Sequence, residues 1–118
     1  MNYIELNRRI LTALRKKLYG EGRVEKVSNE KAIPGIEYTM NTMKTISDYY
    51  ALIDDDEERR AKNIYHRTVK VLHDKLNGSK RVNALEDENV EGIKFSLVVM
   101  NNQRKYLFHT IQKAIENK

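Results

Sequence analysis

The sequence contains no cysteine and no tryptophan, and it has a single proline among its 118 residues. Without cysteine the chain cannot form a disulfide scaffold, a cysteine-based zinc site or a thiol nucleophile. The apolar run Leu97–Met100 is far shorter than the ~20 residues that span a bilayer. The first residues also lack the unbroken apolar segment of a signal peptide. These absences favour a cytoplasmic protein with no membrane partner.

Glycine is scarce as well, since the chain has five, and most of them fall where helices are expected to end. No Gly-x-Ser-x-Gly motif, phosphate-binding glycine-rich loop or dinucleotide-binding fingerprint is present. We expect no cofactor and no metal. A chain of 118 residues that is 40% hydrophobic is long enough to bury a core as one domain. We therefore predict a single helical domain over residues 1–118.

Helical periodicity is the main positive signal. Apolar residues recur every three or four positions through most of the chain, which is the spacing of one helix face. Gly20 and Gly78 are placed as C-terminal stops, and Pro34 suits a helix start. The pattern predicts four helices at about 2–19, 35–53, 55–77 and 88–116. The predicted fold class is therefore all-α, a single-domain four-helix bundle.

Residues 93–100 leave one alternative open. This segment keeps helical register, yet it also alternates, is rich in β-branched residues and follows Gly92. Read as a strand, it would pair with a short strand at 23–27 and precede a separate final helix at 103–117. The alternative fold class is then α+β.

Two acidic clusters precede predicted helices, at 54–58 and 86–88. Acids in a first helical turn cap free N–H groups and oppose the helix dipole. A cation site is the competing interpretation, because hard cations bind carboxylate oxygens. Consecutive acids fan around a helix axis instead of converging, so we expect these clusters to start helices.

Basic residues exceed acidic ones, 22 against 17, for a net charge of +5. Two sets of them share a helical face. A cationic helix face suits a phosphate backbone or an acidic protein surface, and histidine would strengthen it as the pH falls. The candidate residues for an anionic partner are Arg8, Arg9, Arg15 and Lys16 in the first helix and Arg59, Lys62, His66 and Lys70 in the third.

The second and fourth predicted helices carry more apolar surface than one stripe requires. Helices of this kind are buried centrally, lie at a contact between copies, or bind another protein. Tyrosine and phenylalanine are frequent anchors at such interfaces. The candidate residues for an oligomer or partner interface are Tyr38, Tyr49, Leu52, Phe95, Val99 and Tyr106.

Arg60 and His66 are separated by five residues, and Arg59 also satisfies an Arg-x(4–6)-His spacing. The spacing resembles that of the HEPN ribonucleases, which are small helical bundles and often dimers. The resemblance implies that the arginine stabilises a phosphate and that the histidine assists attack by an RNA 2′-hydroxyl, without a metal. On an ideal helix Arg60 and His66 lie about 120° apart, so a kink or a partner chain would have to bring them together.

The leading functional prediction is a small non-catalytic binding or regulatory protein. It would be a homo-oligomer that engages nucleic acid or an acidic protein surface through a basic face. The alternatives are a HEPN-like ribonuclease using Arg60 and His66, and a protein-binding inhibitor or immunity-type bundle whose charge serves solubility. The many Lys, Asn and Ile residues indicate an AT-rich genome, as in a virus or a mobile element.

Overall fold

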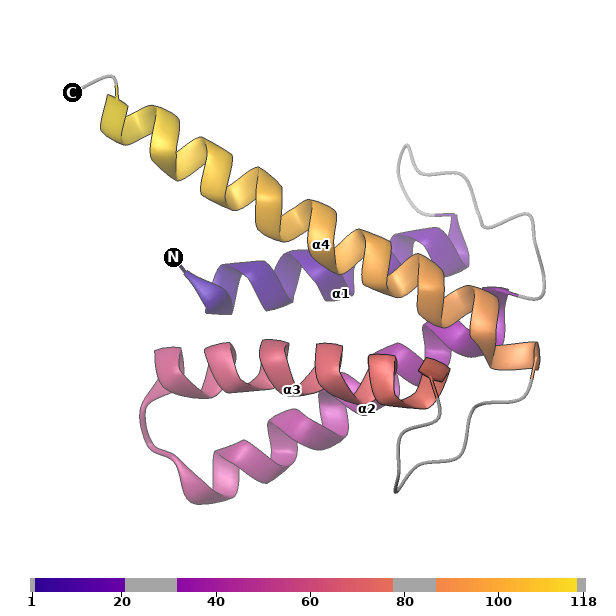
Figure 1. Ribbon diagram of the computed structural model, residues 1–118. Coiled ribbons are helices and arrows are strands. Elements are labelled where there is room, and N and C mark those ends of the chain that lie inside the picture. Colours follow the sequence, from indigo (N-terminus) through magenta and orange to yellow (C-terminus); the bar gives the residue numbers. More distant parts are fainter. Residues whose placement is uncertain (1, 21–31, 78–86, 117–118) are drawn as a thin grey trace.

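The computed structural model describes residues 2–20, 32–77 and 87–116. They form four α-helices, and each helix packs against the other three. The all-α four-helix bundle is therefore confirmed. The longest helix, α4, crosses the others diagonally, and its C-terminal end extends beyond them (Figure 1). The elements are α1 (Tyr3–Tyr19), α2 (Ile33–Ile53), α3 (Glu57–Asn77) and α4 (Asp87–Glu116).

The strand alternative for residues 93–100 is wrong, because this segment lies inside α4. Ile93, Ser96 and Met100 are buried at helical spacing, whereas Lys94 and Val98 point to solvent. Packing of one face against the other helices overrides the β-propensity of the individual residues. The separate final helix at 103–117 is wrong for the same reason. The possible strand at 23–27 lies outside the described residues.

The helix ends follow the local signals. Asn2 Oδ1 accepts a hydrogen bond of 3.0 Å from the Glu5 N–H at the start of α1. Gly20 ends the helix with a φ of 67°, and its N–H donates to Lys16 O at 2.8 Å. This left-handed conformation favours glycine. The predicted stop is thus confirmed.

The acidic cluster between α2 and α3 makes the turn that joins them. Asp54 ends α2, and its Oδ1 accepts a hydrogen bond of 2.9 Å from the Asp56 N–H. Asp56 Oδ1 in turn accepts one of 2.8 Å from the Arg59 N–H, which is the geometry of an N-cap. The capping interpretation of residues 54–58 is confirmed, and α3 begins two residues later than the predicted 55.

The core is built from one apolar stripe on each helix. Burying an aliphatic side chain of this size stabilises the fold by about 1.5–3 kcal/mol, so the four helices hold one another in place. The largest fully buried aliphatic side chains are Leu6, Ile10, Leu14, Ile36, Met43, Leu72, Ile93 and Met100.

Helices α2 and α4 approach most closely at two glycines. A Cβ atom on Gly92 would lie 2.1 Å from Ala32 O and 2.5 Å from Gly35 Cα, so only glycine fits. The buried hydroxyls of Thr39 and Ser96 donate to the carbonyls of Gly35 and Gly92 at 3.0 and 2.7 Å. Gly92 is thus a packing residue inside α4, and it lies within the helix predicted at about 88–116.

Candidate anion-binding face

The outward side of α1 carries most of its basic residues. Leu6, Ile10 and Leu14 are fully buried on the inner side. Two helical contacts fix how α1 faces α3: Asn7 Nδ2 donates to Ala61 O at 2.9 Å, and Tyr3 lies against His66. Thr12 lies five residues after Asn7, about 140° around the helix axis, and so points away from α3.

An open groove of about 340 Å³ separates α1 from α4. Three of its side chains are cationic and one, Glu5, is acidic. Both helices contribute to it, because Gln103 of α4 closes the far side. The lining residues are Glu5, Arg8, Arg9, Thr12, Ala13, Lys16 and Gln103.

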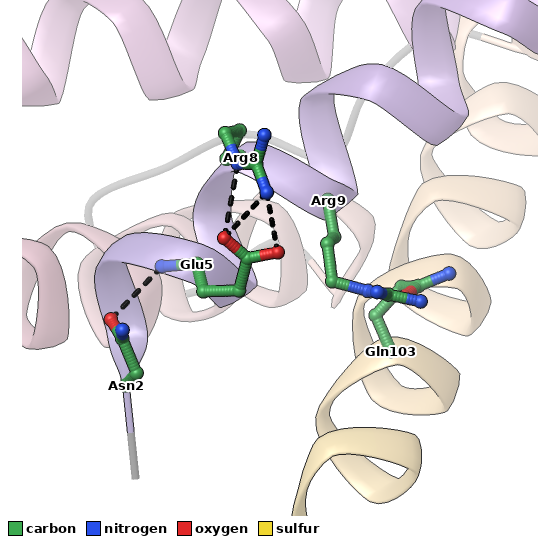
Figure 2. Close-up of polar contacts among 5 residues, drawn as sticks. All are labelled: Asn2, Glu5, Arg8, Arg9 and Gln103. Carbon is green, nitrogen blue, oxygen red and sulfur yellow. Dashed lines mark hydrogen bonds and ion pairs between the residues drawn. The ribbon is translucent and has the colours of Figure 1, made fainter.

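Arg9 spans this groove. Its Nε donates to Gln103 Oε1 at 3.0 Å, and its guanidinium carbon lies 4.7 Å from the centroid of the Tyr106 ring. Figure 2 shows Arg9 extending from α1 toward Gln103 on α4. Both partners are uncharged, so the arrangement orients the guanidinium and leaves its positive charge uncompensated by them.

Arg8 is held differently. Its Nη2 lies 2.6 Å from both carboxylate oxygens of Glu5, one turn earlier on α1 (Figure 2). Hydrogen bonding to Arg8 lowers the pKa of Glu5 below its ordinary value. The Arg8 side chain remains 71% exposed, so a phosphate can approach it, in competition with Glu5.

A second open groove, of about 510 Å³, lies on the other flank of α1, against α2. It shares Arg8 and Thr12 with the first groove, so the two are contiguous across α1. Lys44 of α2 joins Arg8 and Arg15 here. The lining residues are Arg8, Leu11, Thr12, Arg15, Met40, Asn41 and Lys44.

We call Arg8, Arg9, Arg15, Lys16 and Lys44 the α1 basic face. Sequence reasoning identified the four residues of the first helix and missed Lys44. Helical periodicity shows which face of a helix is polar, but not which neighbouring helix that face meets. Met40 and Lys44 are one turn apart, and only the packing of α2 against α1 makes that turn part of the face.

The predicted basic stripe of α3 consists of Arg59, Lys62, His66 and Lys70, and two of its cations are paired with carboxylates. Arg59 makes two hydrogen bonds, of 2.6 and 2.7 Å, to Asp54. They lower the pKa of Asp54 to about 2, with a further contribution from the Asp56 N–H. Lys70 Nζ lies 3.3 Å from Asp74 Oδ2.

His66 is exposed on one side and lies against the rings of Tyr3 and Tyr65 on the other. Its Nε2 hydrogen bonds with the Tyr3 hydroxyl at 3.3 Å, and its ring centroid lies 5.3 Å from that of Tyr65. Burial lowers the pKa of His66 below its ordinary value, and the nearby charges of Arg104 and Lys62 lower it further. His66 is therefore mostly neutral at neutral pH and adds little to a cationic surface there.

The two basic sets face different directions. On α1 the shared residue Thr12 points away from α3. On α3, Lys70 lies nine residues after Ala61, about 180° around the axis, while Ala61 faces α1. None of the described residues that line the two grooves of the α1 basic face comes from α3, although His66 of the α3 stripe contacts Tyr3 of α1.

Arg60 and His66, the residues that resemble the ribonuclease motif, have different partners. Arg60 Nη1 donates to Asp54 O at 2.8 Å, at the turn between α2 and α3. His66 contacts Tyr3 of α1. The fold directs these side chains to different elements, and their proposed catalytic roles stay a prediction.

The six candidate interface residues divide into two groups. Tyr38, Phe95 and Val99 pack against the core, as expected for helices with two buried sides. Tyr49, Leu52 and Tyr106 are 58%, 86% and 54% exposed. Use of the exposed three in an oligomer stays a prediction.

Comparison with models of known protein families, with curated proteins and with solved structures finds no match to this chain. Among the described residues, no helix is both long enough and apolar enough to cross a membrane.

Proposed function

We propose that the protein is a non-catalytic nucleic-acid-binding protein that contacts phosphates through the α1 basic face. The observation that supports this is the pair of contiguous grooves along α1. They bring together five cationic side chains, and Glu5 is the single carboxylate among the described residues that line them. Such a concentration of charge attracts a polyanion and releases its counterions on binding.

The arrangement of the cations supports a nucleic acid over an acidic protein surface. Three of the five cations are arginines, whose planar fork can bind two oxygens of a phosphate or of a carboxylate at once. The cations also lie on both flanks of one helix. A duplex offers two backbones to two flanks, so we expect tighter binding to a duplex than to a single strand.

A salt series of binding to a labelled DNA duplex and a labelled single strand tests the proposal. The key variant neutralises four residues and spares Arg9, which contacts α4. It carries Arg8→Gln, Arg15→Gln, Lys16→Gln and Lys44→Gln. A control removes the same charge from exposed lysines elsewhere. It carries Lys62→Gln, Lys70→Gln, Lys94→Gln and Lys105→Gln.

We expect the α1 variant to reduce the slope of log affinity against log salt by about three to four, and the affinity at 0.1 M salt by about 10²–10³-fold. The control should change affinity far less. The proposal fails if the wild-type protein binds neither probe at low salt, or if both variants lose affinity equally. Binding to an acidic polypeptide but to neither nucleic acid would assign the face to a protein partner instead.

A further inference from the structure

A pocket of about 380 Å³ lies between α3 and α4. It is separate from the two grooves beside α1, because it shares none of its residues with the α1 basic face. Its size falls within the ~300–1,000 Å³ range of small-molecule sites. It has an apolar floor and a polar rim. The lining residues are Tyr65, His66, Val69, His73, Leu97, Val98, Met100, Asn101 and Arg104.

The floor of the pocket is fixed by the core. Tyr65 and Met100 are buried, with 5% and 1% of their surface exposed, and Leu97 and Val69 pack against the core beside them. Tyr65 belongs to an aromatic cluster, because its ring centroid lies 5.7 Å from that of Tyr3. The apolar surface that the pocket can offer a ligand therefore comes mainly from Val69, Leu97 and the exposed Val98, and such a surface favours an apolar ring.

The rim carries hydrogen-bond donors from both helices. Arg104 and Asn101 are one turn apart on α4, and His66 and His73 are two turns apart on the facing side of α3. The Arg104 guanidinium carbon lies 5.9 Å from the centroid of the Tyr65 ring, at the junction of floor and rim. Among the described residues that line the pocket there is no carboxylate.

We propose that this pocket binds a phosphate ester attached to a ring, as in a nucleotide, with the ring against Val69, Leu97 and Val98 and the phosphate at the rim beside Arg104 and the histidines. Arg104 supplies a permanent charge and a bidentate fork. Asn101 and the histidines supply further donors. The ligand is either a free nucleotide or a terminal nucleotide of a strand, since both present this chemistry.

The charges around His66 give the site a pH dependence. His66 faces Lys62 and Tyr65 on α3, Tyr3 on α1 and Arg104 on α4. Burial and the charges of Arg104 and Lys62 lower the pKa of His66, so protonation of this ring is disfavoured without a ligand. A phosphate dianion would favour it. Binding should therefore take up a proton and become tighter as the pH falls from 7.5 to 6.

Titration calorimetry and NMR on the protein test the proposal with five probes. They are a nucleoside 5′-monophosphate, the corresponding nucleoside, inorganic phosphate, a trinucleotide with a 5′-phosphate and the same trinucleotide without it. We expect the monophosphate to bind at least tenfold more tightly than the nucleoside or phosphate alone. Phosphate binding as tightly as the monophosphate would overturn the role of the floor. Equal binding of the two trinucleotides would overturn the need for a terminal phosphate.

Variants separate the pocket from a non-specific charge effect. His73→Gln changes an exposed rim residue and should weaken monophosphate binding about threefold to tenfold. Arg104→Gln should weaken it more. Lys105→Gln, an exposed neighbour on α4 that does not line the pocket, is the control and should change it less than twofold. The proposal is contradicted if the two rim variants match this control while retaining the wild-type fold.

This site is independent of the proposed function. The α1 variant that loses duplex binding should keep nucleotide binding, because none of its four residues lines this pocket. Conversely, His73→Gln should leave duplex binding unchanged. Failure of one proposal therefore does not imply failure of the other.

Discussion

The basic residues of α1 and α3 look equivalent in sequence, yet the structure gives them different surroundings. On α1, Arg8 is paired with Glu5, but Arg9 is oriented by the uncharged Gln103 and Tyr106. On α3, Arg59 and Lys70 are paired with Asp54 and Asp74. The number of cations on a helix face is therefore a poor measure of the electrostatic potential at that face. The acids within reach, on the same helix or across a turn, decide how much charge remains for a partner.

Gly92→Ala should have the largest effect, because it would disturb the packing of α4 against α2 that holds the bundle, and with it both basic surfaces, in place. The new Cβ atom would meet the backbone of α2 at 2.1 Å, and overpacking of this kind costs about 1–3 kcal/mol. That cost should exceed the ~1 kcal/mol by which alanine favours a helix over glycine. Urea denaturation measures the free energy of unfolding. Lys94→Ala, two residues away and exposed, should leave it nearly unchanged, and equal stability of the two variants would contradict the close crossing.

Arg9→Gln tests the α1 side of the comparison alone. It removes one oriented charge, so duplex affinity at 0.1 M salt should fall about tenfold, and the salt slope by about one. It also removes a cation–π contact worth about 0.5–1 kcal/mol at exposed sites. Lys62→Gln on α3 serves as the matched change. Fluorescence anisotropy of a labelled duplex measures the affinity. An equal loss in both variants would show that the α1 basic face and the α3 stripe contribute equally to binding.

Asp54→Asn removes the carboxylate that pairs with Arg59. Duplex affinity should change far less than for Arg9→Gln, because Arg59 does not line the two grooves of the α1 basic face. The carboxyl titrates near pH 2 in the folded chain against 3.8 for the ordinary group. Its stabilisation is therefore complete above pH 3.8 and is lost as the pH falls toward 2. Between pH 7 and 2, the melting temperature of the wild type should fall more steeply than that of the variant. If the two curves are parallel, the Asp54–Arg59 pair does not contribute to the loss of stability in acid.

The smallest effect is expected from His66. Its pKa in the folded state lies below the ordinary value of 6.5, so the unfolded chain takes up a proton first as the pH falls. Stability from the neutral ring is full above 6.5 and declines as the pH falls through the folded pKa. The melting temperature should depend less on pH in His66→Gln than in the wild type between pH 7 and 5, and the difference should be no more than a few degrees. If the melting temperature of the wild type rises between pH 7 and 5 and that of His66→Gln does not, the pKa of His66 is raised on folding and this prediction is wrong.

Much of the fold was predictable because its signals are local. The apolar periodicity of the first helix and the Gly20 stop depend on neighbours within one or two turns, and the predicted helix and its stop are confirmed. Residues 93–100 were ambiguous because helix and strand patterns coincide over a short apolar run. Only the contact of Gly92 with α2 decides that segment, and this contact joins residues far apart in the chain.

The candidate site was less predictable than the fold. The pairing of Lys70 with Asp74 follows helical spacing, and that of Arg8 with Glu5 does so as well. The contribution of Lys44 and the contact of Arg9 with Gln103 depend on how α2 and α4 pack beside α1. Tertiary neighbours of this kind leave no mark in the spacing of a single helix.

The crossing of α2 and α4 has an evolutionary consequence. Any change at Gly92 adds atoms where Ala32 and Gly35 leave no room, so related chains with this fold should retain glycine at this position. Exposed cations such as Arg15 and Lys44 can exchange between arginine and lysine with less effect on folding. Among related chains, the most conserved position would then be one that packing requires. The residues of a binding face could change around it while the arrangement of the four helices stays the same.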